Sequence, residues 1–132
     1  MYKNFKDMPV WIEAMEMAES VFHLSDILPK KEDYGLTSQL RRSALSVSGN
    51  IAEAFGRYHI NDKINFYYFS RGSLAETMSH LEYGTRVGYF KSKETERINY
   101  MIEKLYESIN RLIKSLKIKY KTRSESQSQS QS

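Results

Sequence analysis

The chain has 132 residues, no cysteine and a formal net charge of +4. This length suffices for one domain with a substantial core, and the missing cysteines exclude disulfides, thiolate metal sites and cysteine nucleophiles. The N-terminal residues lack the apolar core of a signal peptide, and no uncharged apolar run approaches the roughly 20 residues that cross a bilayer. We therefore expect a cytoplasmic protein without a membrane segment.

Two helices are predicted in the first half of the chain. The first covers residues 7–28, with Asp7 as its N-cap, Pro9 in its first turn and Pro29 at its end. The second begins at residue 33 or 36 and ends at residue 55, and Gly56 follows as its cap. Both segments carry apolar residues at the spacing that an amphipathic helix requires.

Two further helices are predicted in the second half. The third has Asn61 or Asp62 as its N-cap and ends before Gly88, and the fourth begins after Ser92. The fourth carries an apolar seam whose members alternate steps of four and three residues: Ile98, Ile102, Leu105, Ile109, Leu112 and Leu116.

Four amphipathic helices joined by short loops predict an all-α fold, an antiparallel up-down-up-down four-helix bundle. We assign the bundle to residues 1–120. Residues 121–132 form a Ser/Gln-rich tail with nothing to bury, for which we predict disorder.

A ladder of polar residues runs beside the apolar stripe of the second helix, at helical spacing: Ser46, Asn50, Glu53 and Arg57. Facing positions of a hairpin formed with the third helix should sum to roughly 118, which sets Ser46 against Gly72 at a close crossing. Arg71 falls on the apolar line of the third helix, so we expect it to be buried and neutralised by the ladder, with Asn50 nearest and Glu53 more distant. A ligand or nucleic-acid site and a contact between subunits are the alternative interpretations of the ladder.

The end of the fourth helix is strongly basic. No acidic residue lies between Glu107 and Glu125, and the cations in that interval form a candidate site for RNA phosphates: Arg111, Lys114, Lys117, Lys119 and Lys121, with Arg123 adjoining. The alternative is that these cations only complement the dipole at a helix C-terminus and stay solvated.

The segment LTSQLRRSALSVSGNIAEAFGR (residues 36–57), together with GSLAE (residues 72–76), resembles the 23S rRNA intervening-sequence proteins. The likeness extends over most of residues 8–118 and includes VWIEAMEMA, DYGL and VGYF; it departs at Ala54, where the family usually has glycine. The resemblance implies a bundle that assembles into a homo-oligomeric ring, a pentamer, and it implies no settled biochemical activity. Many relatives are encoded within insertions in rRNA genes, and distant ones are similar to the accessory protein of diversity-generating retroelements.

The residues predict neither an enzyme nor a cofactor site. Glu19 with His23 and Glu76 with His80 have the spacing of ordinary surface pairs, and no Ser-based catalytic motif or phosphate loop occurs. We therefore expect a homo-oligomeric binding module that contacts RNA or an RNA-bound protein through its basic surface. A protein–protein adaptor with no nucleic-acid role is the main alternative, and a metal-binding or enzymatic bundle is a weaker third.

Overall fold

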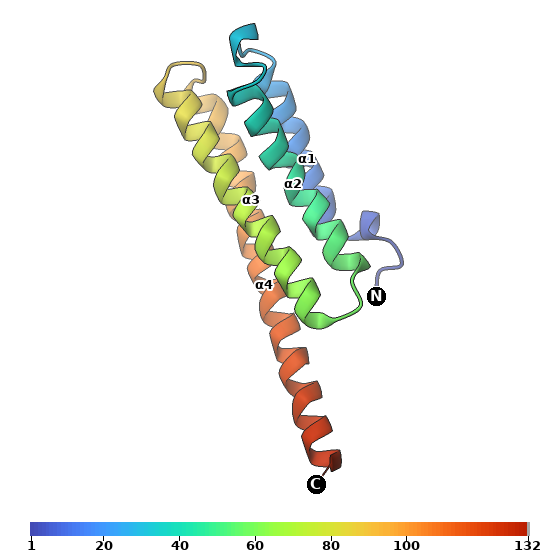
Figure 1. Cartoon of the computed structure of the whole chain (residues 1–132). Coiled ribbons are helices and arrows are strands. Elements are labelled where there is room, and N and C mark those ends of the chain that lie inside the picture. Colours follow the sequence, from blue (N-terminus) through green and yellow to red (C-terminus); the bar gives the residue numbers. More distant parts are fainter. Residues whose placement is uncertain (132) are drawn as a thin grey trace.

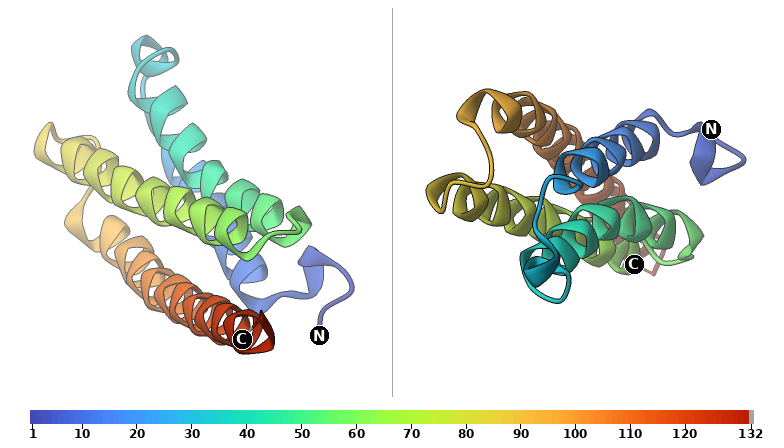
Figure 2. Two further views of the ribbon diagram at one scale, coloured as in Figure 1. Left: turned by 60° about the horizontal axis from the view of Figure 1, so that its bottom comes forward. Right: turned by 90° about the horizontal axis from the view of Figure 1, so that it is seen from above.

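The computed structural model describes residues 1–131, and within them it confirms the predicted all-α four-helix bundle (Figure 1). Two short 3-10 helices accompany four α-helices in the order η1 (Phe5–Asp7), α1 (Pro9–Ser25), η2 (Lys30–Glu32), α2 (Leu36–Gly56), α3 (Ile60–Arg86) and α4 (Ser92–Gln131). Helix α1 packs against α2 and α4, and α3 also packs against α2 and α4. Two views along other directions show α1 beside α2 and α3 beside α4 (Figure 2).

The helix ends lie close to their predicted positions, with local corrections. Asp7 belongs to η1, and Met8 is the residue that precedes α1. His59, rather than Asn61 or Asp62, precedes α3. At the end of α3, Gly88 adopts a φ of 91°, a left-handed conformation that glycine reaches without strain, and it turns the chain toward α4.

The core runs along the inner faces of all four helices. Its largest fully buried apolar side chains are Met17, Val21, Leu40, Val47, Ile51, Leu74, Leu81, Ile102, Leu105 and Ile109. On α4 the seam is buried as predicted as far as Ile109, after which Ile113 is buried while Leu112 and Leu116 are only half-buried. A helix with 3.6 residues per turn drifts relative to a strict 3.5-residue repeat, and this drift brings Ile113 toward the core.

Helix α4 continues as far as Gln131, so residues 121–131 are helical where the sequence predicts disorder. The last position of the predicted tail, Ser132, lies outside the described residues. The side chains of residues 117–130 are all exposed, so the tail adds nothing to the core, as its composition indicates. Its helical backbone follows from position: the packed part of α4 supplies the nucleus, and each further residue adds one backbone hydrogen bond. Figure 1 shows this part of α4 extending beyond the α2–α3 turn.

At the other end of the bundle, a side-chain hydrogen bond joins the loop between α3 and α4 to η2. The Tyr89 hydroxyl donates to Glu32 Oε2 (2.8 Å), and Glu32 Oε1 accepts from the Leu36 backbone N–H (3.2 Å). The Tyr89 and Leu36 hydrogen bonds lower the pKa of Glu32, and the same Glu32 contact raises the pKa of Tyr89. The Glu32 contribution to stability is therefore present above the ordinary glutamate pKa and is lost as pH falls through the lowered value.

Among residues 1–131, no helix is both long enough and apolar enough to cross a membrane.

Candidate functional site

Hydroxyl groups line the crossing of α2 and α3. Three hydrogen bonds donated by hydroxyl groups join the helices here: Ser70 Oγ donates to the Val47 carbonyl (2.9 Å), Ser73 Oγ to Ser46 Oγ (3.0 Å), and Thr77 Oγ1 to Ser43 Oγ (2.9 Å). Small side chains of α2 thus contact small side chains of α3, as predicted. The residue numbers of each bonded pair sum to within about two of the predicted 118. The α2–α3 crossing is a structural contact.

The prediction that Gly72 faces Ser46 is wrong. Gly72 is exposed, and a Cβ atom placed on it would have nothing within 4 Å. The neighbouring Ser73 makes the contact instead, because one residue turns a helix by about 100° and so separates two faces. The spacing of Ser70, Ser73 and Thr77, by three and then four residues, was the available sequence signal for the face that packs on α2.

The polar ladder of α2 is satisfied largely within that helix. Asn50 Nδ2 donates to the carbonyl and to the hydroxyl of Ser46 (2.9 and 3.0 Å). Glu53 and Arg57 form an exposed ion pair (3.4 Å), and the Arg57 guanidinium lies 4.6 Å from the centre of the Phe66 ring. An exposed pair of this kind contributes little to stability.

Arg71 binds α4, so the prediction that Asn50 and Glu53 neutralise it is wrong. Its Nη1 donates to Asn110 Oδ1 (2.9 Å), and its guanidinium lies 4.9 Å from the centre of the Tyr68 ring and 5.8 Å from that of Tyr106. The side chain is half-buried, with aromatic faces and an amide around it. Arg71 follows Ser70 by one residue, and the resulting turn of about 100° directs it away from α2 toward α4.

We expect a double-mutant cycle of Arg71→Met with Asn110→Ala to give a coupling energy of about 0.5–3 kcal/mol, because the two side chains share a charge-assisted hydrogen bond. The measurement is the free energy of unfolding in urea. The matched cycle of Arg71→Met with Asn50→Ala should give no coupling, since Asn50 is bound to Ser46. Equal coupling in both cycles would contradict the assignment.

The five predicted RNA-binding cations are all exposed: Arg111, Lys114, Lys117, Lys119 and Lys121. None of them has a carboxylate partner within residues 1–131. Two make other contacts: Arg111 Nη2 donates to Ser108 Oγ (3.1 Å), and the Lys117 ammonium lies 5.5 Å from the centre of the Tyr68 ring. Helical spacing places four of the five on one side of α4 and turns Lys119 away from them, so the five cations do not form one patch.

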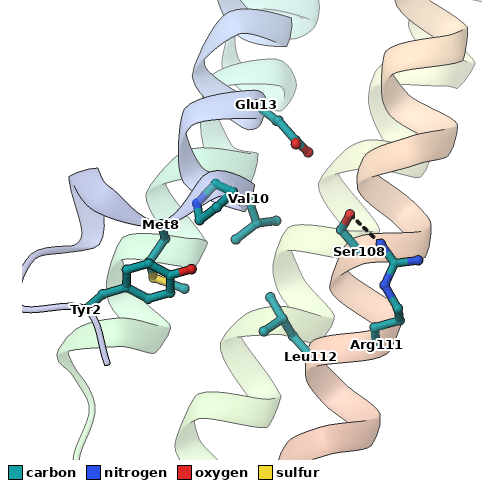
Figure 3. A pocket seen from close by; sticks show the side chains of 8 residues that line it. Tyr2, Met8, Val10, Glu13, Ser108, Arg111 and Leu112 are labelled. Atoms are coloured by element: carbon teal, nitrogen blue, oxygen red, sulfur yellow. Dashed lines mark hydrogen bonds between the residues drawn. The ribbon is translucent and has the colours of Figure 1, made fainter.

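Arg111 borders a recess between the start of α1 and α4 (Figure 3). The recess measures about 260 Å³ and is mainly apolar, with Tyr2, Met8, Val10 and Leu112 among its lining residues. Figure 3 shows Arg111 directed toward Ser108 at the α4 side, with Glu13 on the α1 side. Arg111 therefore has different surroundings from the other four cations.

Lys119 borders a larger groove, of about 770 Å³, where α4 passes the α2–α3 turn. The turn contributes Tyr58 and His59, and α4 contributes Tyr120 and Arg123 beside Lys119. Sequence reasoning placed Lys119 and Arg123 in the basic segment but did not bring them to the turn, because only the packing of α3 on α4 sets that approach.

No three His, Asp or Glu side chains of residues 1–131 lie close enough to hold a metal ion. His80 Nε2 lies 3.4 Å from Glu76 Oε1, the ordinary contact of residues four apart on a helix surface.

Most of the chain is similar to known proteins. The family model described as 23S rRNA-intervening sequence protein matches residues 6–127. A solved crystal structure, of a protein with unknown function from the S23 ribosomal protein family of Bacteroides thetaiotaomicron VPI-5482, is similar with a TM-score of 0.74 and 25% sequence identity. That similarity covers 80% of this chain and 98% of the other. No curated protein matches the chain.

Proposed function

The chain belongs to the 23S rRNA-intervening sequence protein family, and on this premise we propose that it is a non-enzymatic, homo-oligomeric module that binds RNA through the basic part of α4. The observation that carries the proposal is the set of four exposed cations on one side of α4, none of which is paired with a carboxylate of residues 1–131: Arg111, Lys114, Lys117 and Lys121. Lysine and arginine side chains of this kind offer charge to phosphates rather than recognition of base edges. Binding should therefore depend steeply on salt and little on sequence.

Self-association is part of the proposal, and exposed aromatic side chains support it. Phe69, Tyr83 and Tyr106 are 58%, 53% and 39% exposed, and Phe66 and Tyr89 are partly exposed beside the core. Exposed apolar surface of this kind often marks an interface between proteins. The resemblance to ring-forming relatives favours a pentamer, in which each subunit would contribute its own α4 cations.

The test replaces Arg111, Lys114, Lys117 and Lys121 by Gln and measures RNA affinity against salt concentration. We expect the slope of log affinity against log salt to fall in magnitude by about 0.7 for each phosphate of a single strand that the variant no longer neutralises. The measurement is fluorescence anisotropy of a labelled RNA, with sedimentation at micromolar concentration to show that the variant keeps an assembly larger than the 15.5 kDa chain.

A matched control removes the same charge from the other end of the bundle, with Lys30, Lys31, Lys91 and Lys93 replaced by Gln; all four are exposed there. The control should keep the wild-type slope. If wild-type protein binds no RNA at low salt, or if both quadruple variants behave alike, the adaptor interpretation replaces the RNA proposal.

A further inference from the structure

The core-facing seam of α4 changes from apolar to cationic where the helix leaves the bundle. The seam steps by four and three residues through Ile109, Leu112 and Leu116, and its next two positions are Lys119 and Arg123. Both side chains line the groove of about 770 Å³ at the α2–α3 turn, and Tyr120 lies between them in sequence. These cations therefore lie on the side of α4 that faces the rest of the molecule.

The opposite wall of the groove is a turn held in place by Lys63. The Lys63 ammonium donates to the carbonyls of Ala54 and Phe55 (3.1 Å each), which end α2, and burial lowers its pKa. These hydrogen bonds join the start of α3 to the end of α2. The intervening Tyr58 is 90% exposed, and its ring stands nearly perpendicular to that of His59, with 5.1 Å between the ring centres.

The lining of the groove thus combines exposed aromatic rings with positive charge. Tyr120 is 47% exposed, and Lys119 and Arg123 have no carboxylate partner within residues 1–131. Asp62 is the one acidic residue among those that line the groove, against three cations. Proteins bind single-stranded nucleic acids by combining cations along the phosphate backbone with aromatic rings that stack on the bases.

We propose that this groove binds single-stranded RNA, with Lys119 and Arg123 on successive phosphates and an unstacked base against Tyr58 or Tyr120. The inference rests on the proposed function and specifies the form of RNA that it takes. Duplex RNA fits the groove poorly, because its bases are already stacked on one another and its major groove is too deep and narrow for side chains to enter. The outward cations, Lys114 and Lys121, contribute charge to either form.

The experiment compares a labelled 12-nucleotide oligouridylate with a 12-base-pair RNA duplex by fluorescence anisotropy. Wild-type protein is expected to bind the single strand more tightly at equal salt. The combined changes Tyr58→Ala and Tyr120→Ala should weaken single-strand binding by about fivefold or more, because losing one stacked base costs at least about 1 kcal/mol. The same changes should leave the slope of log affinity against log salt unchanged. Combined Lys119→Gln and Arg123→Gln changes should instead lower the slope by about 1.4.

The matched control combines Tyr34→Ala and Tyr100→Ala, which removes two exposed rings that do not line the groove and should leave both affinities unchanged. Thermal melts of every variant check that the fold is kept. If wild-type protein binds RNA but the Tyr58/Tyr120 variant binds the single strand equally well, or if duplex and single strand bind alike, the groove assignment is wrong while the proposed function stands. Absence of any RNA binding at low salt would overturn both.

Discussion

Replacing Ser70 by leucine is expected to destabilise the protein by about 1–3 kcal/mol or more. Ser70 is fully buried at the α2–α3 crossing, and its hydroxyl donates to the Val47 carbonyl (2.9 Å). A leucine there needs space that two closely packed backbones do not leave, so the helices must separate or the side chain must take a strained rotamer. Urea unfolding measures the change in the free energy of unfolding.

The control for this prediction is the same substitution on the exposed side of α3, Ser79→Leu. Both variants add the same side chain to the same helix, so helix propensity cancels in the comparison. Ser79→Leu should change the stability by no more than about 0.5 kcal/mol. Equal midpoints for the two variants would mean that α2 and α3 do not approach each other closely at Ser70.

The second large effect is expected at Gly84, where α3 approaches the loop that leads to α4. A Cβ atom on Gly84 would overlap the Phe90 ring, with 2.5 Å to Phe90 Cδ2, and would lie 3.4 Å from Leu36 Cδ2. Phe90 is only 4% exposed, so its ring cannot move away from the added carbon without disturbing the side chains packed around it. We expect Gly84→Leu to destabilise the protein at the upper end of the range of about 1–3 kcal/mol that overpacking costs, measured as a lower thermal midpoint.

Gly72→Leu is the matched control for Gly84→Leu. Both glycines lie inside α3, and replacing either removes the helix penalty of glycine, about 0.8–1.0 kcal/mol relative to alanine. Because nothing lies within 4 Å of a Cβ atom on Gly72, that change should be neutral or stabilising. Should Gly84→Leu fail to fold, Gly84→Ala tests the same clash with one added carbon. A stabilised Gly84→Ala would contradict the predicted clash.

The fold could be predicted because its elements follow from local signals. Apolar residues at helical spacing, Pro29, Gly56 and Gly88 define the segments, and short connections make neighbouring helices antiparallel. The register of α2 against α3 also follows, since a short turn leaves few ways to align two helices. Helix caps were less predictable: His59 and Met8 precede their helices without a side-chain cap, so no favoured capping residue marks these positions.

The candidate site was less predictable because it depends on the rotation of each helix about its axis. Gly72 and Ser73 are both small, and only the packing of Leu74, Thr77 and Leu81 decides which of them faces α2. The partner of Arg71 lies 39 residues away on α4, and sequence spacing within a hairpin cannot identify a residue of a third helix. The α4 groove likewise required the packing of α3 on α4.

The exposed C-terminal part of α4 affects the thermodynamics of any binding in the groove that we propose for RNA. Residues 117–130 have only exposed side chains, so their helix depends on backbone hydrogen bonds and on the packed turns that precede them. Such a segment unfolds locally more readily than the packed turns, and its amide protons should exchange with solvent far faster than those of the bundle. Lys119, Tyr120 and Arg123 form one wall of the groove only while that segment is helical. An RNA strand bound there would therefore shift the helix–coil equilibrium of this segment toward the helix. The free-energy cost of ordering the segment would lower the net affinity for the strand.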